Sequence, residues 1–150
     1  MITKKPNPRS NSVRSGTLAF AGILVLAAIA FLLNFRLFFT SGPSMEPTYT
    51  DGTVLLSVRL YSDPKPGEVV FLRHEDYYCM KRVAFVAGED VSQAGYESYW
   101  GSNIIPEGYV FVLGDNTAES FDSRDPAFGL VAVSDIWGKA LDQRQKGAGT

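Results

Sequence analysis

Residues 77–86 read YYCMKRVAFV, which places two adjacent basic residues inside a largely apolar run. Its aromatic and β-branched content predicts a strand. Successive side chains of a strand point to opposite faces, so positions 79, 81, 83 and 85 share one face. Three of these positions are apolar (Cys79, Val83 and Phe85), which directs Lys81 into an apolar layer. Arg82 then points the other way, where acidic residues can pair with it.

The chain beyond residue 36 carries further signals of the same kind. Apolar, β-branched or aromatic runs predict strands at residues 53–58, 68–73, 109–113 and 130–133, and another at 136–140. Turn signals separate them, for example Asp51-Gly52, Gly88-Glu89-Asp90 and Pro106-Glu107-Gly108. None of this region shows a sustained helical period. We therefore predict a mainly β domain of short strands.

One apolar segment precedes this domain. Residues 17–33, TLAFAGILVLAAIAFLL, carry no charge. As a helix they would be about 26 Å long, close to the lower limit for crossing a bilayer. Four basic residues precede the segment and Arg36 follows it, which places the N-terminus in the cytoplasm. The sequence thus predicts a single-pass protein of the cytoplasmic membrane.

The predicted organisation has four parts. They are a basic, disordered cytoplasmic tail at 1–16, a transmembrane anchor at 17–35, an extracytoplasmic domain at 36–141 and a flexible C-terminal tail at 142–150. A cleaved signal peptide would require small residues just beyond the apolar core. Ala28-Ile29-Ala30 instead lies inside the core, before Phe31-Leu32-Leu33, which favours a retained anchor. Leu37-Phe38-Phe39 has two interpretations, a first strand of the domain or a lip that enters the headgroup layer.

Charge and composition exclude several classes of site. Residues 1–36 hold five of the 14 basic residues and no acid, which leaves nine basic residues against all 16 acidic ones in the remainder. Such an acidic domain is poorly suited to bind nucleic-acid phosphates, so we predict no nucleic-acid partner. One cysteine and one histidine do not supply the four ligands of a structural zinc site. We predict no metal and no cofactor.

Ser44 is a candidate nucleophile, because Pro43 and Pro47 stiffen the backbone around it. A serine hydroxyl needs a base within hydrogen-bond reach. The only histidine, His74, sits in a charged run, RHED, that is typical of a solvated turn. Lys81 is the other candidate, because burial lowers the pKa of a lysine from its usual value of about 10.4. From the pattern alone, Lys81 could also reach water at a strand edge, and Ser44 could be a simple turn residue.

A third polar cluster, GDNTAESFDSR, occupies residues 114–124 directly after the predicted strand 109–113. A surface loop is the simplest interpretation of this cluster. In the alternative, Asp122 and Arg124 pair across one turn, and Ser120 reaches back into a site.

Taken in order, these clusters resemble the motifs of the type I signal peptidases, which are membrane-anchored Ser-Lys endopeptidases. Ser44-Met45-Glu46-Pro47-Thr48 matches the nucleophile motif, and Lys81-Arg82-Val83 matches the lysine motif. Pro66-Gly67-Glu68-Val69-Val70-Phe71 is similar to the strand motif between them, and residues 114–124 match the last motif at every fixed position. The resemblance covers nearly the whole region after the anchor and implies a signal-peptidase-like antiparallel sheet.

The resemblance also implies roles. Ser44 attacks the scissile carbonyl, and Lys81, as a neutral amine, takes its proton, passes it to the leaving amine and then activates the deacylating water. Ser120 holds the lysine amine in place. A supporting ion-pair network is formed by Asp122, Arg124 and Arg82.

Two features of the site differ among family members or from the family's pattern. The backbone N–H of Ser44 donates to the oxyanion, and in some members a serine two residues before the nucleophile completes the oxyanion hole. Here that position is Gly42. After the lysine, the family's Gly-x-Pro-Gly-Asp is Phe85-Val86-Ala87-Gly88-Glu89, and the stretch up to Gly114 leaves little room for an accessory β-insert.

The implied function is cleavage of signal peptides from secreted preproteins after A-x-A sites, with preproteins and membrane lipid as partners. Pockets for small side chains are expected to be lined by Met45, Val70, Tyr78 and Val83. Two alternatives remain, a maturation peptidase dedicated to one client such as a pilin or conjugation protein, and an inactive membrane-tethered binding domain. A self-cleaving repressor of related Ser-Lys fold would need a DNA-binding module where this chain has its anchor.

Overall fold

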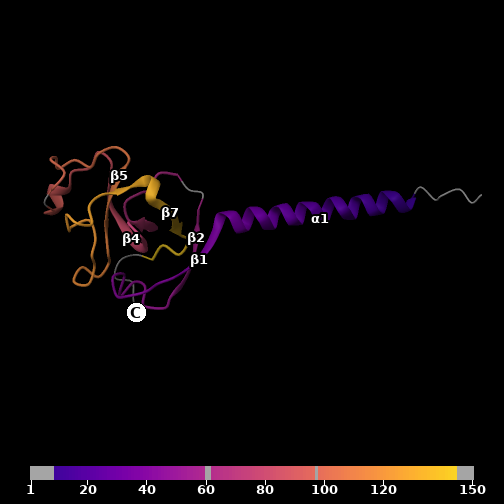
Figure 1. Ribbon diagram of the computed structural model, residues 1–150, viewed down its shortest axis with the longest axis horizontal. Coiled ribbons are helices and arrows are strands. Elements are labelled where there is room, and N and C mark those ends of the chain that lie inside the picture. Colours follow the sequence, from indigo (N-terminus) through magenta and orange to yellow (C-terminus); the bar gives the residue numbers. More distant parts are fainter. Residues whose placement is uncertain (1–8, 60–61, 97, 145–150) are drawn as a thin grey trace, which may run out of the picture. The chain divides into compact units, whose positions relative to one another are not determined.

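The chain forms two compact units, Met1–Asn34 and Phe35–Thr150. The structure is a computed structural model that describes residues 9–59, 62–96 and 98–144 (Figure 1). The described part of the first unit is one helix, and the second unit holds one antiparallel sheet. The prediction of a mainly β protein with an N-terminal apolar helix is therefore confirmed.

Helix α1 runs from Arg9 to Asn34. Its segment Gly16–Asn34 has a mean hydropathy of 2.5, is long enough to cross a membrane and buries none of its residues in the protein. Such an exposed apolar helix is suited to a bilayer. The expected disorder of the tail is wrong from Arg9 onward, because no proline interrupts the chain between Pro8 and Pro43 and the helix extends into polar residues. Residues 1–8 lie outside the described part.

Seven strands make up the sheet of the second unit. In chain order they are β1 (Phe35–Phe39), β2 (Val54–Val58), β3 (Val69–His74), β4 (Tyr77–Val86), β5 (Tyr109–Leu113), β6 (Val131–Ala132) and β7 (Ile136–Ala140). Their order across the sheet is β1-β2-β7-β3-β4-β5-β6. Two short 3₁₀ helices, η1 (Val91–Ala94) and η2 (Val133–Asp135), lie in the connections.

The predicted strands are all present. Those at 77–86, 109–113 and 136–140 have the predicted bounds. The one at 53–58 differs by one residue at its start, and those at 68–73 and 130–133 differ by one residue at both ends. Leu37-Phe38-Phe39 belongs to β1, and the ring of Phe38 stacks on Phe71 with centroids 4.1 Å apart, which confirms the first-strand interpretation. The side chains on the opposite side of β1, Leu37 and Phe39, are exposed.

Strand β4 changes partners along its length. Its first part forms a hairpin with β3 through the turn Glu75-Asp76, and its second part, from Arg82, pairs with β5. The register with β5 shifts between Val83 and Phe85. This irregularity interrupts the alternation of the strand, with consequences for where its side chains pack.

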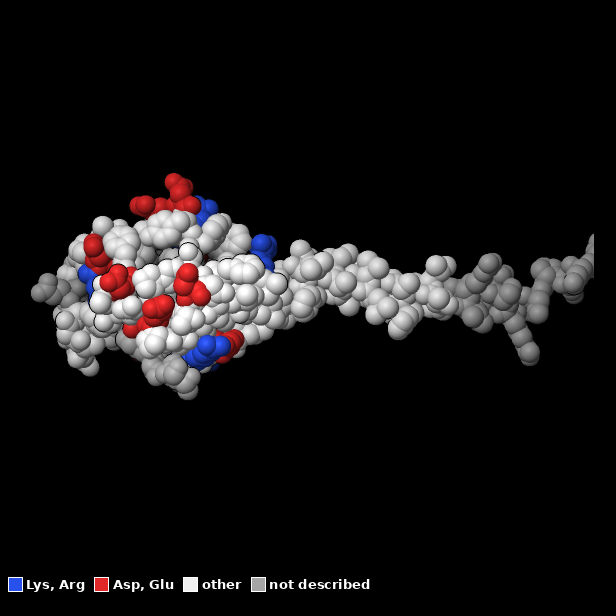
Figure 2. Space-filling model, turned by 90° about the horizontal axis from the view of Figure 1, so that it is seen from below, with Lys and Arg blue, Asp and Glu red and all other residues white. Residues whose placement is uncertain are grey.

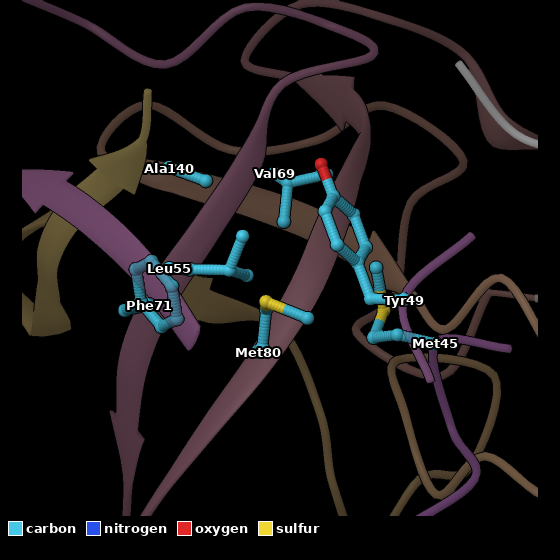
Figure 3. Close-up of a cluster of buried hydrophobic side chains, with 7 residues drawn as sticks. All are labelled: Met45, Tyr49, Leu55, Val69, Phe71, Met80 and Ala140. Carbon is cyan, nitrogen blue, oxygen red and sulfur yellow. The ribbon is translucent and has the colours of Figure 1, made fainter. Parts of the chain in front are cut away.

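Apolar side chains are buried on both faces of the sheet, since alternate residues of β3 belong to different clusters. The first cluster, shown in Figure 3, consists of Met45, Tyr49, Leu55, Val69, Phe71, Met80 and Ala140. The second consists of Val70, Leu72, Val83, Val110, Val112, Phe128 and Val131, with Cys79 packed against it. The prediction that Phe85 shares this face is wrong, because beyond the register shift Phe85 packs with Phe111 in a third cluster.

The surface of the β-domain is acidic, as the sequence predicts. Figure 2 shows acidic side chains spread over the visible face of this unit, with fewer basic ones among them. The described exposed part of α1 carries apolar side chains instead, including Leu18, Leu26 and Leu32.

Candidate active site

Ser44 lies in a turn that several contacts fix, here called the Ser44 turn (residues 43–49). The N–H of Glu46 donates to the carbonyl of Pro43 at 3.0 Å, and the N–H of Tyr49 donates to that of Met45 at 2.9 Å. The side chains of Met45 and Tyr49 are buried in the first apolar cluster (Figure 3). The turn is therefore anchored by buried side chains directly after the half-buried Ser44, and the hydrogen bond from Glu46 to Pro43 closes it around this residue.

A groove of about 400 Å³ runs beside Ser44. It is lined by Phe38, Phe39, Thr40, Ser41 and Ser44, and by Phe71, Tyr77, Tyr78, Cys79 and Met80. Along residues 77–81, β4 pairs with β3 only, because its pairing with β5 begins at Arg82. Within the described residues, one backbone edge of β4 at the groove thus has no strand partner.

The amine of Lys81 is shielded from water. The residue is 4% exposed, and its Nζ donates to Oγ of Ser120 at 3.1 Å. Burial lowers the pKa of Lys81 from 10.5, and Arg124 adds to the lowering, while Cys79 and Asp122 act in the opposite direction. Lys81 therefore becomes a neutral amine at a lower pH than a surface lysine does. The interpretation that Lys81 is buried is confirmed, and the interpretation that its side chain reaches water is wrong.

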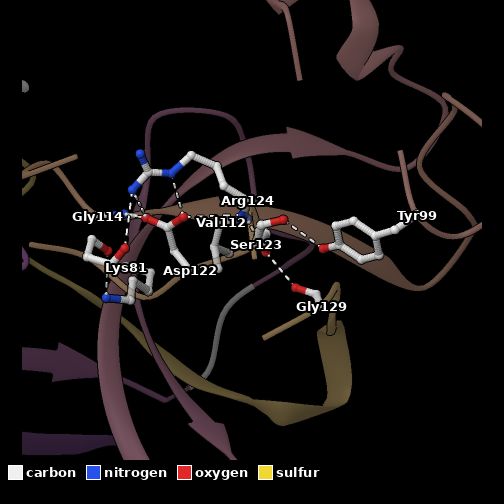
Figure 4. Close-up of polar contacts among 9 residues, drawn as sticks. Lys81, Tyr99, Val112, Gly114, Asp122, Ser123, Arg124 and Gly129 are labelled. Atoms are coloured by element: carbon white, nitrogen blue, oxygen red, sulfur yellow. Dashed lines mark hydrogen bonds and ion pairs between the residues drawn. The ribbon is translucent and has the colours of Figure 1, made fainter. Parts of the chain in front are cut away.

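A charged pair stands behind Ser120. Nε and Nη2 of Arg124 donate to the two carboxylate oxygens of Asp122 at 2.8 and 2.9 Å, and the N–H of Gly114 donates to Oδ2 at 2.9 Å (Figure 4). Burial alone would raise the pKa of Asp122, but hydrogen bonds from Arg124, Gly114 and Ser120 outweigh it and hold the pKa below 3.8. Asp122 is thus charged and accepts from Ser120, which leaves the Ser120 oxygen as an acceptor for Lys81.

Ser123 fixes the same loop from its other side. This fully buried residue donates through Oγ to the carbonyl of Gly129 at 2.8 Å and accepts from the N–H of Val112 at 3.1 Å. The hydroxyl of Tyr99 donates to the carbonyl of Ser123 at 2.7 Å (Figure 4). Burial and nearby acids raise the pKa of Tyr99 to about 12, so this donor keeps its proton.

Gly114 is the point at which the Ser44 turn meets the loop of Ser120. A Cβ on Gly114 would lie 2.2 Å from Oγ of Ser120 and 2.5 Å from the carbonyl oxygen of Ser44. The N–H of Asn116 also donates to that carbonyl, at 3.0 Å. Since Lys81 binds the Ser120 hydroxyl, this close approach brings Ser44, Ser120 and Lys81 into one site.

The variant Gly114→Ala should therefore lower kcat/KM for peptide cleavage by about 100-fold or more. The added methyl would overlap both oxygens, and a displacement of about 1 Å at a catalytic group costs roughly that factor. Steady-state cleavage kinetics of the full chain measure the loss in kcat/KM, and thermal unfolding shows whether the variant remains folded. Gly22→Ala is the control, because nothing lies within 4 Å of that glycine. Full activity in Gly114→Ala would show that the close approach is not needed.

Arg82 forms an ion pair of its own. Its Nε and Nη2 donate to the carboxylate of Asp115 at 2.7 and 2.6 Å, and Nη1 donates to the carbonyl of Gly67 at 2.8 Å. The single network predicted for Arg82, Asp122 and Arg124 is thus two separate pairs. Arg82 nevertheless points away from Lys81 toward an acid, as the alternation of the strand predicts.

The two predicted oxyanion positions differ in availability. Gly42 adopts a φ of 83°, and its N–H donates to Oδ1 of Asp51 at 2.9 Å. Pro43 has no N–H to offer. Among the described residues, no hydrogen bond uses the N–H of Ser44, which leaves this donor available.

Of the residues predicted to line substrate pockets, only Tyr78 lines the groove. Met45 is buried in the first cluster, and Val70 and Val83 are buried in the second. The alternation of β3 presents Phe71 to the groove in place of Val70. The other lining residues were missed because the groove combines β1 and the Ser44 turn with β4, a pairing that no local pattern reveals.

Two other groups do not compete with Lys81 and Ser44. His74 is not in a solvated turn: its ring stacks on Phe128 with centroids 4.1 Å apart, and Nε2 donates to the carbonyl of Phe128 at 2.9 Å. Cys79 lines the groove, but burial raises its pKa to about 11, so the thiol stays protonated and a weak nucleophile. Across residues 9–59, 62–96 and 98–144, no three His, Cys, Asp or Glu side chains are grouped to hold a metal.

Comparison with known proteins connects this arrangement to one family. The family model described as signal peptidase, peptidase S26, matches residues 13–99 and 91–142. Signal peptidase I of Bacillus amyloliquefaciens is 27% identical over 169 residues, covering 89% of this chain and 91% of that protein. Mitochondrial ATP-independent inner membrane protease subunit 1b of Arabidopsis thaliana is 37% identical over 112 residues, 67% and 64% of the two chains. Mitochondrial inner membrane protease subunit 2 of Danio rerio is 29% identical over 130 residues, which cover 79% of this chain and 66% of that protein.

Proposed function

The chain belongs to the signal peptidase family, peptidase S26, and is a serine endopeptidase of the type I signal peptidase class; on that premise we propose that Ser44 is its nucleophile and Lys81 its neutral base. One observation carries this assignment. The amine of Lys81 is buried, has a lowered pKa and is held by Ser120, whose hydroxyl meets the carbonyl of Ser44 at Gly114.

In the first half of the reaction, Oγ of Ser44 bonds to the scissile carbonyl carbon while Nζ of Lys81 takes the hydroxyl proton. The tetrahedral intermediate then collapses and the carbon–nitrogen bond breaks. The lysine ammonium gives its proton to the leaving amine, which departs as the new N-terminus. Ser44 is left as an acyl ester and Lys81 is neutral again.

In the second half, Lys81 takes a proton from a water molecule as the water oxygen attacks the ester carbon. The ester bond to Ser44 breaks, and the proton returns from Lys81 to the Ser44 oxygen. The released signal peptide carries the new carboxyl group. The N–H of Ser44 donates to the oxyanion in both halves, a contact that strengthens as the negative charge develops.

Ser120 orients the lysine. Its hydroxyl hydrogen is directed to the charged Asp122, so its oxygen accepts an N–H from Lys81. This contact uses a hydrogen of the amine and leaves the nitrogen lone pair for the Ser44 hydroxyl. Asp122 raises the pKa of Lys81, and Arg124 opposes this effect, so the pair as a whole disturbs the neutral base less than Asp122 would alone.

The substrate lies in the groove as an added strand. The unpaired edge of β4 at residues 77–81 offers backbone groups to an extended peptide, which is a common mode of peptide recognition. The stacked rings of Phe38 and Phe71 both line this groove, and none of its lining residues is charged, which suits small apolar side chains of a substrate. Small residues at the first and third positions before the cut fit this groove, which supports A-x-A specificity.

Membrane attachment concentrates enzyme and substrate together. The described apolar helix and the relatives named as inner membrane proteases support attachment through α1, with the N-terminus in the cytoplasm and the catalytic domain outside. Only nine residues lie between the end of α1 at Asn34 and Ser44, and an extended chain from Asn34 to Ser44 spans at most about 35 Å. The signal peptide of a preprotein enters the same bilayer, so lipid is a shared partner of both.

The test is cleavage of a preprotein by the full chain in lipid vesicles. A preprotein with alanine at the first and third positions before the cut should be processed. A version with phenylalanine at the first position should be processed at least tenfold more slowly if the site selects small side chains there, as proposed. Equal rates for both would contradict the specificity. Repeating the assay with many preproteins separates a general enzyme from one dedicated to a single client.

A further inference from the structure

Residues 142–144, here called the C-terminal strap, are attached to the Ser44 turn mainly at the hydroxyl group of Tyr49. Oη of Tyr49 donates to the carbonyl of Asp142 and accepts from the N–H of Arg144 at 2.9 Å. The guanidinium of Arg144 lies over the Tyr49 ring, 5.3 Å from its centroid, and Nη1 donates to the carbonyl of Thr48 at 3.4 Å. Tyr49 is thus held from the side opposite its own turn by residues more than 90 positions away in the chain.

Gln143 fastens the strap to the sheet. Its Oε1 accepts from the N–H of Val69 at 2.7 Å, and its Nε2 donates to the carbonyl of Val69 at 3.2 Å. The side-chain amide therefore pairs with both backbone groups of Val69, as a neighbouring strand would. Val69 lies in the same buried cluster as Met45 and Tyr49 (Figure 3).

The contacts continue from Tyr49 to Ser44. The Tyr49 side chain is fully buried, and its N–H donates to the carbonyl of Met45, the residue after Ser44. Burial raises the pKa of Tyr49, so the hydroxyl keeps the proton that it donates to Asp142. A shift of the Tyr49 ring would therefore be transmitted to the backbone on which Ser44 stands.

We propose that Asp142, Gln143 and Arg144 are positioning residues that hold the Ser44 turn through Tyr49, although none of them reaches the groove. The proposal rests on the assignment of Ser44 as the nucleophile. It makes the C-terminal end of the domain part of the catalytic apparatus, since the strap fixes how far Ser44 stands from Lys81. A loss of the strap should slow the chemical step and leave substrate binding intact.

Two truncations of the full chain test this proposal. Ending the chain after Leu141 removes the strap, and ending it after Arg144 keeps the strap and removes only residues 145–150. The chain that ends after Leu141 should show a kcat for preprotein cleavage at least tenfold lower than that of the full chain, with a KM within about twofold of it. Both are measured in lipid vesicles well below the unfolding temperature. The chain that ends after Arg144 should match the full chain. A loss of activity explained by a larger unfolded fraction would instead overturn the positioning role.

Two single variants cover the case in which the shorter chain does not fold. Tyr49→Phe keeps the ring and removes both hydroxyl hydrogen bonds, and Gln143→Ala releases Val69. Each should lower kcat at least threefold with KM unchanged. If kcat is unchanged in both, or KM rises while kcat holds, the proposal is wrong.

Amide hydrogen exchange at Tyr49 provides a readout that does not depend on catalysis. Removing the strap should speed exchange of this N–H at least tenfold relative to the chain that ends after Arg144, because the turn then opens more often. If the Tyr49 amide exchanges at the same rate with and without the strap, the strap does not hold the Ser44 turn, and this conclusion holds even for an inactive protein. An inactive full chain with protected Tyr49 would refute the nucleophile assignment and leave the strap standing.

Discussion

Replacing Ser44 with alanine should lower kcat/KM for preprotein cleavage by about 10⁴-fold or more. The variant loses the only atom that can form the acyl ester, while the buried anchors of the turn, Met45 and Tyr49, remain in place. Initial rates with an Ala-x-Ala preprotein, measured beside thermal unfolding, give the result. A drop in activity without a drop in the unfolding temperature is the expected combination.

The matched control for Ser44 is Ser134→Ala, a change at an exposed serine in η2 outside the groove. Its activity should equal that of the unchanged chain. Processing by Ser44→Ala at more than about a tenth of the original rate would mean that another group forms the covalent bond. Cys79, which lines the same groove, would be the first residue to examine.

The variant Lys81→Met should be similarly inactive, with a loss of about 10³-fold or more in kcat/KM, because methionine fills the same volume but cannot accept the Ser44 proton. The protein should remain folded. In the unfolded chain a lysine titrates near 10.5, and in the fold its pKa is lower. Between these two values the unfolded state binds more protons, so the stability of the original protein falls as pH decreases through this window.

Methionine carries no such proton, so Lys81→Met should be at least as stable as the original protein at neutral pH and should lose this pH dependence. Chemical denaturation at several pH values measures both effects. Lys65→Ala, a change at an exposed lysine outside the groove, should alter neither activity nor stability. A folded, fully active Lys81→Met would show that the base has been assigned to the wrong residue.

Much of the fold was predictable from local sequence patterns. Strand β4 was predicted with its observed bounds, because a ten-residue segment rich in aromatic and β-branched residues lies between turns and has no comparable helical interpretation. The alternation in β4 also predicted that Lys81 points inward and Arg82 outward. The order of the motifs, rather than any one of them, indicated that Ser44, Lys81 and Ser120 belong to one site.

The rest depends on contacts between segments distant in the chain. The register shift after Val83 moved Phe85 to another cluster, and a single strand does not encode the pairing that causes such a shift. Asp115 was missed as the partner of Arg82. Several acidic residues follow β5, and their positions in the sequence do not indicate which of them pairs with Arg82. Gly114 was part of the matched motif. The reason why this position must lack a side chain appears only in the structure, where Ser44 and Ser120 both approach it closely.

The C-terminal strap was also not predicted from the sequence, because its contacts are with segments distant in the chain. Residues 142–150 were predicted as a flexible tail, since their composition is polar and rich in glycine. Within residues 142–144, each residue makes hydrogen bonds to the Ser44 turn or to β3. Polar residues form such specific bonds as readily as they remain solvated, so composition alone does not separate the two outcomes.

The pH dependence of kcat/KM for preprotein cleavage tests the central claim most directly, because this claim is that the buried amine of Lys81 acts as a neutral base. Activity should rise with pH and level off above an apparent pKa that lies below 10.5, and the variant His74→Phe should show the same profile. An apparent pKa at or above 10.5, or a rise that disappears in His74→Phe, would contradict the account.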